Sequence, residues 1–174
     1  MVDMSRVNRI WNHPLYQTHL HQLLEAEEER EFCRHTVEHF LDVARLTYIF
    51  VLEAGLSVSR EVIYAAALLH DIGRRMQYDQ GIPHEKASAG IAKEILPECG
   101  FSGEETGMIL EAILSHRKKE TGVNLNALMY RADKMSRLCF CCPSRSRCDW
   151  PEEKKNMTIQ YCPGGTMKIG NREF

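Results

Sequence analysis

Apolar residues recur at three- and four-residue intervals along most of the chain, with polar residues between them. This spacing places apolar side chains on one face of an α-helix and is typical of helices that pack on a shared core. From residue 14 to residue 138 it predicts successive helices separated by turns. The expected helices cover residues 15–29, 31–54, 61–75 and 84–96, a stretch after Ser102, and a stretch from Asn124 or Asn126 through Met135.

Residues with preferences for helix ends mark several of these boundaries. Gly55 follows the second expected helix as a C-terminal cap would, and Ser102 can cap the helix that it precedes. Pro83 suits the first turn of a helix, which Pro97 and Gly100 then end. The order of elements predicts an all-α bundle.

The helix expected over residues 61–75 is apolar nearly all round, so it should be the most buried element. The dipeptide His70-Asp71 lies toward its end. A buried carboxylate is costly unless it is paired or bound to a metal. In isolation, such a dipeptide is more often a capping Asp beside a hydrogen-bonded core His.

The dipeptide is not isolated, because further candidate ligands sit on separate expected helices. Each is flanked by apolar residues at helical spacing, so each can point inward: His39, His84, His116 and Asp133. Helical bundles build metal sites from side chains on facing helices. Imidazole and carboxylate ligands together suit Fe, Mn, Zn, Co or Ni.

The character of the chain changes after Leu138, where helical periodicity ends. We treat residues 1–138 as one domain and residues 139–174 as a small, mostly irregular, cysteine-rich C-terminal appendage. Two short strands are expected around Pro163-Gly164-Gly165.

The cysteines of the appendage form a second candidate site. Cys139 and Cys142 have the two-residue gap common in zinc sites and iron–sulfur clusters. The candidate ligands of a structural zinc or an iron–sulfur cluster are Cys139, Cys142, Cys148 and Cys162. The alternative is a set of reduced thiols packing a loop, or a redox or partner-docking tail. Cys33 and Cys99 are expected in the core, on helical faces.

Composition and charge narrow the classes of function. Of 174 residues, 44% are hydrophobic and 26% charged, as in a globular domain. A formal net charge of −2 argues against a partner that is a nucleic-acid polymer or an anionic membrane, but a small phosphorylated substrate needs only a local basic pocket. No apolar run reaches the roughly 20 residues of a membrane span. The N-terminus lacks a secretory pattern, so we expect a cytoplasmic protein with reduced thiols.

Five segments, in order, resemble the HD-domain superfamily of metal-dependent phosphohydrolases. The first contains His39 four residues before a Val-Ala step, and the second contains the His-Asp pair that gives the family its name. The segments are EHFLDVARLTYIFVLEAGLS, AALLHDIGRR, IPHEKASAGIAKEIL, ILEAILSHRKK and ALMYRADKMSR. The resemblance covers residues 30–138 and implies an HD-domain helical bundle.

The resemblance also implies a ligand set. One metal would be held by His39, His70, Asp71 and Asp133, the common core of the family. His84 and His116 match the extra histidines of members with two metals, in which the Asp of the dipeptide bridges both ions. His116 is followed by Arg117, where two-metal members often carry a second His. One divalent transition metal therefore stays an alternative to two.

Candidate substrate contacts lie next to these ligands. Lys134 follows Asp133 directly and is the first candidate for binding phosphate, with Arg74 and Arg117 next. His35 lies one helical turn before His39 in the expected helix, so it can contact substrate or orient a ligand, and the alternative is a surface histidine without a role in the site. His13, His19 and His21 are expected to be structural.

The resulting expectation is a phosphohydrolase that acts on a small phosphorylated molecule, a nucleotide in the first place, through metal-activated water, with Asp71 as both ligand and catalytic residue. Two alternatives remain open at this point: a catalytically silent, nucleotide-binding regulatory module and a di-iron oxygenase on the same scaffold. The oligomeric state is open, with a homodimer as one option.

Overall fold

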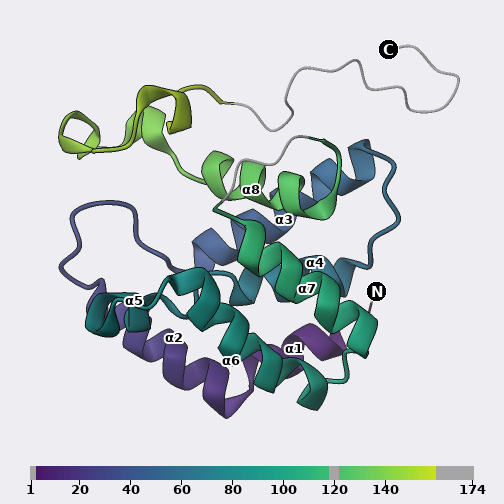
Figure 1. Cartoon of the computed structure of the whole chain (residues 1–174). Helices are drawn as coiled ribbons and strands as arrows, with labels where there is room; N and C mark the ends of the chain where they lie inside the picture. The colour runs from purple at the N-terminus through teal and green to yellow at the C-terminus, as the bar shows by residue number, and fades with distance from the viewer. Residues whose placement is uncertain (1–2, 118–121, 160–174) are drawn as a thin grey trace, which may run out of the picture.

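The computed structural model describes residues 3–117 and 122–159, and in these residues it contains helices but no strand. This confirms the predicted all-α fold (Figure 1). The α-helices of the described chain are α1 (Ser5–Trp11), α2 (Pro14–Ala26), α3 (Val37–Glu53), α4 (Arg60–Leu69), α5 (Arg74–Gln80), α6 (His84–Glu98), α7 (Gly103–Ser115) and α8 (Leu125–Met135). Three single turns of 3-10 helix follow: η1 (Cys139–Cys141), η2 (Arg145–Arg147) and η3 (Glu152–Lys154).

Helix α4 lies at the centre of the bundle, packed against α3 and α7, with further contacts to α1 and α6. Its residues Val62 and Ile63 and all those from Ala65 to Leu69 are buried, as the apolar pattern predicted. Helix α8 packs across α3 and α7, while α2 and α5 cover one side of α6 (Figure 1). A single hydrophobic core joins the bundle, so the ends of α3, α4, α6, α7 and α8 are held in fixed relation.

Several predicted helix starts are confirmed by hydrogen bonds. The Ser102 hydroxyl accepts from the backbone N–H of Glu105, and the Glu105 carboxylate accepts from the N–H of Ser102, which forms a capping box at α7. Asn124, rather than Asn126, caps α8 by accepting from the N–H of Ala127 at 2.8 Å. Pro83 is the N-cap of α6. Helices α7 and α8 therefore begin where their polar caps lie.

The helix expected from Glu31 begins only at Val37, so that prediction was wrong by six residues. Thr36 has an extended backbone, and its side chain accepts from the N–H of His39 as the N-cap of α3. Residues 31–36 form an irregular connection from α2. Cys33 is therefore not on a helical face, and it is half-buried rather than in the core. Cys99, in contrast, is in the core as expected.

The helix expected over residues 61–75 is also interrupted. It ends at Leu69, and residues 70–73 form a turn before α5 begins. The ring of His70 donates from Nδ1 to the carbonyl of Ala67 at 2.7 Å, which supplies a side-chain partner for one of the last carbonyls of α4. Gly73 allows the turn to lie against α6, where its N–H donates to Ser88 Oγ at 2.9 Å. Pro97, expected to end α6, lies within its last turn.

The described part of the appendage, residues 139–159, is irregular apart from η1, η2 and η3, as predicted. The strands expected around Pro163-Gly164-Gly165 lie outside the described residues. Within the ranges that the structure describes, no helix has both the length and the apolar character needed to cross a bilayer.

Candidate metal centre

Six side chains implied as ligands by the sequence come together between the ends of five helices. Their potential ligand atoms form two compact groups, and every residue in both groups is buried. The first group is His39, His70, Asp71 and Asp133, and the second is Asp71, His84 and His116. Asp71 belongs to both groups, so one carboxylate joins them.

The two oxygens of Asp71 face different groups. Oδ2 lies 3.2 Å from Nε2 of His70 and 3.9 Å from Nε2 of His39. Oδ1 lies 3.1 Å from Nε2 of His84 and 3.6 Å from Nε2 of His116. This is the arrangement of a carboxylate that can bridge two ions.

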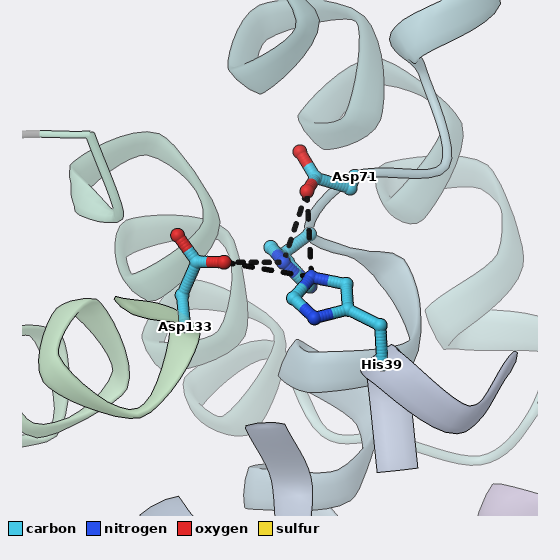
Figure 2. A group of neighbouring side chains, drawn as sticks. His39, Asp71 and Asp133 are labelled. Atoms are coloured by element: carbon cyan, nitrogen blue, oxygen red, sulfur yellow. Dashed lines mark ion pairs between the residues drawn. The ribbon is translucent and has the colours of Figure 1, made fainter. Parts of the chain in front are cut away.

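Asp133, from the last turn of α8, closes the first group from the opposite side. Figure 2 shows its carboxylate and that of Asp71 approaching the His39 ring from two directions. Oδ1 of Asp133 lies 3.4 Å from Nε2 of His39 and 3.9 Å from Nε2 of His70. Two imidazoles and two carboxylates therefore surround one point.

Helix ends aim two of the histidines. His70 and His116 are the C-caps of α4 and α7, and each donates from Nδ1 to a carbonyl in the last turn of its own helix. The distances are 2.7 Å to Ala67 O and 2.5 Å to Ile113 O. These bonds fix both rings with Nε2 toward the centre and satisfy carbonyls that a helix end leaves without partners.

The other two histidines are oriented by neighbouring side chains. His39, in the first turn of α3, has Nδ1 3.0 Å from Ser136 Oγ, and that hydroxyl itself donates to the carbonyl of Asp133. His84, the first residue of α6, has Nδ1 2.5 Å from Oε1 of Gln77. In all four rings Nδ1 is engaged outside the centre and Nε2 faces the centre, as in known metal sites.

The donor set fits a metal. Nε2 of His70 is buried and has no hydrogen-bond partner among the described residues, which is costly for a polar atom unless something else satisfies it. Nε2 of His39 receives a hydrogen bond from Arg137 Nη2 at 2.9 Å. Metal binding at His39 therefore requires this arginine to release the ring.

Charges around the centre keep both carboxylates ionised. Burial opposes ionisation of Asp71, but Arg74 and His70 hold its pKa well below its usual range. Burial likewise opposes ionisation of Asp133, and Lys134 and His70 lower its pKa. Burial lowers the pKa of His39 to about 4. The first group is therefore anionic carboxylates and a neutral His39 ring near neutral pH, the protonation states that metal ligation requires.

The two histidines of the second group lie against each other. Their Nε2 atoms are 3.1 Å apart, within hydrogen-bond distance. Burial lowers the pKa of His84. Burial also acts to lower the pKa of His116, but its contact with Asp71 outweighs this and the pKa is raised.

His35 also faces the centre, although it lies in the irregular connection and not one helical turn before His39. Its Nε2 is 3.5 Å from Asp71 Oδ2, and its Nδ1 is 2.6 Å from Oε1 of buried Glu27. Glu27 also accepts from the hydroxyl of Tyr78. Nothing in the local sequence marks Glu27, because its role depends on a partner eight residues away and another on α5.

A polar cavity of about 220 Å³ opens beside the centre. Its lining includes the candidate ligands His84, His116 and Asp133, four cationic side chains and two aromatic rings. The cations are Arg74, Arg117, Lys134 and Lys154, and the aromatic residues are Tyr130 and Trp150. The three cations expected near the phosphate thus lie on one cavity, joined by two residues of the appendage that the sequence did not single out, Lys154 and Trp150.

The three expected cations differ in their contacts. Nε of Arg74 lies 2.9 Å from Asp71 Oδ1, and Nζ of Lys134 lies 2.5 Å from Asp133 Oδ2 and over the Trp150 ring. Arg117 is more exposed, at 53% of its side chain, and its contact with Glu85 is 3.5 Å. Arg74 and Lys134 therefore neutralise the two carboxylates as well as line the cavity, whereas Arg117 is held by one longer contact.

Comparison with known proteins identifies the class of this fold and site. Residues 36–138 match the family model of the HD domain, so the chain belongs to the HD-domain family. A solved structure described as a predicted HD superfamily hydrolase from an uncultured Thermotogales bacterium has the same fold, with a TM-score of 0.58, 23% identity and 81% of each chain covered.

The chain matches the whole length of one relative but only a small part of two others. An uncharacterized protein of Clostridium beijerinckii is 46% identical over 158 residues, which is 91% of this chain and 100% of that protein. Ribonuclease Y of Mycoplasma mycoides is 29% identical over 106 residues, 60% of this chain but 23% of that enzyme. A bifunctional uridylyltransferase/uridylyl-removing enzyme of Cereibacter sphaeroides is 32% identical over 60% of this chain and 10% of its own length.

Proposed function

We propose that this protein is a metal-dependent phosphohydrolase that cleaves a phosphate ester or anhydride bond in a small molecule, a nucleotide in the first place. The observation that carries the proposal is the position of Asp71, whose two oxygens face two separate groups of buried imidazole and carboxylate ligands. The neighbouring cationic cavity suits an anionic substrate.

His39, His70, Asp71 and Asp133 would hold one divalent transition metal, and Asp71, His84 and His116 a second. When bound, such ions lower the pKa of water to yield a nucleophile near neutral pH and neutralise charge on the phosphate. Iron, manganese, zinc, cobalt and nickel all suit this donor set.

The chain itself would bind and orient the phosphate. Arg74 and Lys134 lie between the ligands and the cavity, so their charges act on both the carboxylates and an incoming anion. Arg117 and Lys154 line the same cavity and add two donors. Positioned cations of this kind stabilise the charge that develops during phosphoryl transfer.

Two aromatic rings favour a nucleotide over a simple sugar phosphate. Tyr130 and Trp150 line the cavity together with the cations. Aromatic rings beside a basic pocket offer a stacking surface for a base. Two relatives that match part of this chain are named for chemistry on nucleotide-derived groups: ribonuclease Y for cleavage of RNA, and the other enzyme for transfer and removal of uridylyl groups.

The test combines metal analysis with hydrolysis of a generic phosphate ester and a nucleotide panel, in the presence of each candidate metal. Asp71→Ala should lose bound metal and reduce hydrolysis to background. Asp79→Ala is the matched control, because Asp79 is exposed and pairs only with Arg75 among the described contacts; it should stay within about twofold of the wild type.

Three outcomes would overturn the proposal. Full hydrolysis by folded Asp71→Ala would remove the metal mechanism. Nucleotide binding without turnover in any metal would indicate a silent regulatory module. Oxygen consumption by the iron-loaded protein without phosphate release would indicate an oxygenase.

A further inference from the structure

A second group of metal-binding side chains lies in the irregular part of the chain. A cavity of about 90 Å³ is lined by Cys33, from the connection between α2 and α3, and by Cys139, Cys142 and Cys148, which follow α8. Cys33 interacts electrostatically with all three of the others. None of the four forms a disulfide in the described chain. Four free thiols from two distant segments therefore meet around one space.

The cysteine between them does not take part. Cys141 is exposed, and its Sγ lies 3.5 Å from the carbonyl of Leu138. The single turn η1 buries Cys139 and turns Cys141 outward. The local backbone thus selects three of the four cysteines in this segment and directs them toward Cys33.

Contacts between the two segments hold the thiols in place. Ser144 Oγ donates to the carbonyl of Glu31 at 3.1 Å, and Arg147 forms an ion pair with the Glu31 carboxylate. Arg137 Nη1 donates to the carbonyl of Arg34 at 2.7 Å. These bonds lie on both sides of Cys33, so its approach to the appendage does not depend on the thiols themselves.

The surroundings of the thiols are cationic. The cavity is also lined by Arg30, Arg74, Arg137, Arg145 and Lys155. Burial raises the pKa of the Cys33 thiol, while Arg137 acts to lower it. The metal-free thiol therefore keeps its proton, and ligation must release it to the solvent as the sulfur binds the metal. The surrounding cations would offset the negative charge of four thiolates.

We propose that Cys33, Cys139, Cys142 and Cys148 bind an iron–sulfur cluster. Four cysteine thiolates are the usual ligands of such clusters. A single zinc ion with Zn–S bonds of about 2.3 Å would need its sulfurs about 3.8 Å apart. No three cysteine sulfurs in the described chain lie within 4.8 Å of one another, so the thiols as placed do not form a ready-made site for one ion.

The cluster would fix the wall of the metal centre. His35 and Arg74 line the cysteine cavity and also contact Asp71. Arg137 joins the carbonyl of Arg34 to the ring of His39. A cluster that ties Cys33 to the appendage would hold these three side chains against the centre. The inference concerns binding alone and does not depend on the proposed hydrolysis.

The experiment measures acid-labile sulfide and visible absorbance in the full-length protein, purified without oxygen and supplied with iron and sulfide. We expect about two or about four sulfide ions per chain, according to cluster type. Sulfide is the decisive quantity because iron alone can bind at the histidines. Cys33→Ser and Cys142→Ser should lose at least three quarters of the sulfide. The matched control Cys141→Ser, and Asp71→Ala, should retain it.

Several results would overturn the inference: wild-type protein without sulfide, stoichiometric zinc at the cysteines, or equal losses in Cys141→Ser and Cys142→Ser. Retention in Cys33→Ser with loss in Cys162→Ser would overturn the assignment of Cys33. If the Cys33 variant does not fold, alkylation of the wild type decides. Cluster-loaded protein should protect Cys33 and Cys142 but leave Cys141 reactive, and equal reactivity of Cys33 and Cys141 would contradict the proposal.

Discussion

The metal centre and the cysteine cavity share a wall, yet they are built in different ways. In the centre, the candidate ligands project from helix ends or, for Asp71, from the turn after α4, and the hydrophobic core already fixes these elements. In the cavity, the thiols come from an irregular connection and from single 3-10 turns, and η2 and η3 contain no buried residue. Regular elements hold the first site, while a few side-chain contacts hold the second.

This difference has a thermodynamic consequence. A group of buried ligands on packed helices keeps its geometry without a metal, because the core supplies the free energy that orders it. An irregular segment with few buried apolar residues gains little from packing, so a bound cofactor contributes a larger share of its order. Removing metal from the centre should therefore change the order of the bundle little. Removing a cofactor from the cysteine cavity should reduce the order of the appendage strongly.

The largest expected effect breaks the packing that the centre relies on. A Cβ at Gly73 would meet the backbone of Ser88 and lie 2.7 Å from the carbonyl carbon of Ala87. Gly73→Ala should separate the turn after Asp71 from α6, cost about 3 kcal/mol in unfolding free energy and weaken binding at His84. Urea denaturation and metal titration measure both.

Gly90→Ala is the matched control for this variant. A Cβ at Gly90 meets nothing within 4 Å, and the position lies within helix α6. It should leave the unfolding free energy unchanged or raise it by about 0.5–1 kcal/mol. Equal stability of the two variants would show that the contact between the turn and α6 does not hold the centre.

The next prediction concerns His35, which lies between the metal centre and the cysteine cavity. Burial lowers the pKa of His35 to about 3, below its ordinary value, so the unfolded chain binds a proton that the folded chain refuses. The contribution of His35 to the unfolding free energy is therefore largest above about pH 6.5. It falls by up to about 1.4 kcal/mol per pH unit as the pH drops toward 3. His35→Asn should reduce the slope of unfolding free energy between pH 7 and pH 5 in metal-free protein.

Exposed His21 supplies the control for that slope. His21→Asn should leave it unchanged. A wild-type slope that His35→Asn does not reduce would contradict the assignment of a neutral, buried His35.

A smaller effect separates binding of the base from binding of the phosphate. Trp150 lines the cationic cavity and lies 5.0 Å from Lys134 Nζ. Trp150→Ala should remove about 1–3 kcal/mol of stacking and raise KM for nucleotides by roughly five- to one-hundred-fold. Bound metal and hydrolysis of a small phosphate ester should be nearly unchanged. Trp11→Ala, on α1, is the control, and equal losses for both substrates would exclude a stacking role.

The same contrast explains what the sequence predicted. Helical periodicity and caps such as Ser102 and Asn124 are local signals, and they located α7 and α8 correctly. Two boundaries failed where a side chain bonds the backbone: Thr36 starts α3 late, and His70 bonds a carbonyl in the last turn of α4. Both residue types are known at helix ends, but apolar spacing that continues past these positions outweighed that signal.

The residues of the two sites also differ in whether the sequence predicted them. Candidate ligands such as His70 and Asp133 lie in segments that resemble the family, so the sequence alone was enough to single them out. Glu27, Gln77 and Trp150 were missed because their roles depend on contacts made outside their own helical turn, which local sequence does not show. Cys33 was assigned to the core for the same reason: its neighbours in the cavity follow α8, more than half the chain away.

The smallest expected effect compares one hydroxyl in each region. Ser102 caps α7 in a capping box, and Ser144 donates to the carbonyl of Glu31 beside Cys33. Each substitution by Ala should remove about 1 kcal/mol of stabilisation from the region in which the hydroxyl lies. Ser102→Ala should lower the unfolding free energy of the bundle and leave sulfide content unchanged. Ser144→Ala should spare the bundle and speed loss of sulfide to a chelator, because it removes a bond that holds the two cysteine segments together. Identical chelation rates in the two variants would mean that the appendage is ordered by something other than these contacts.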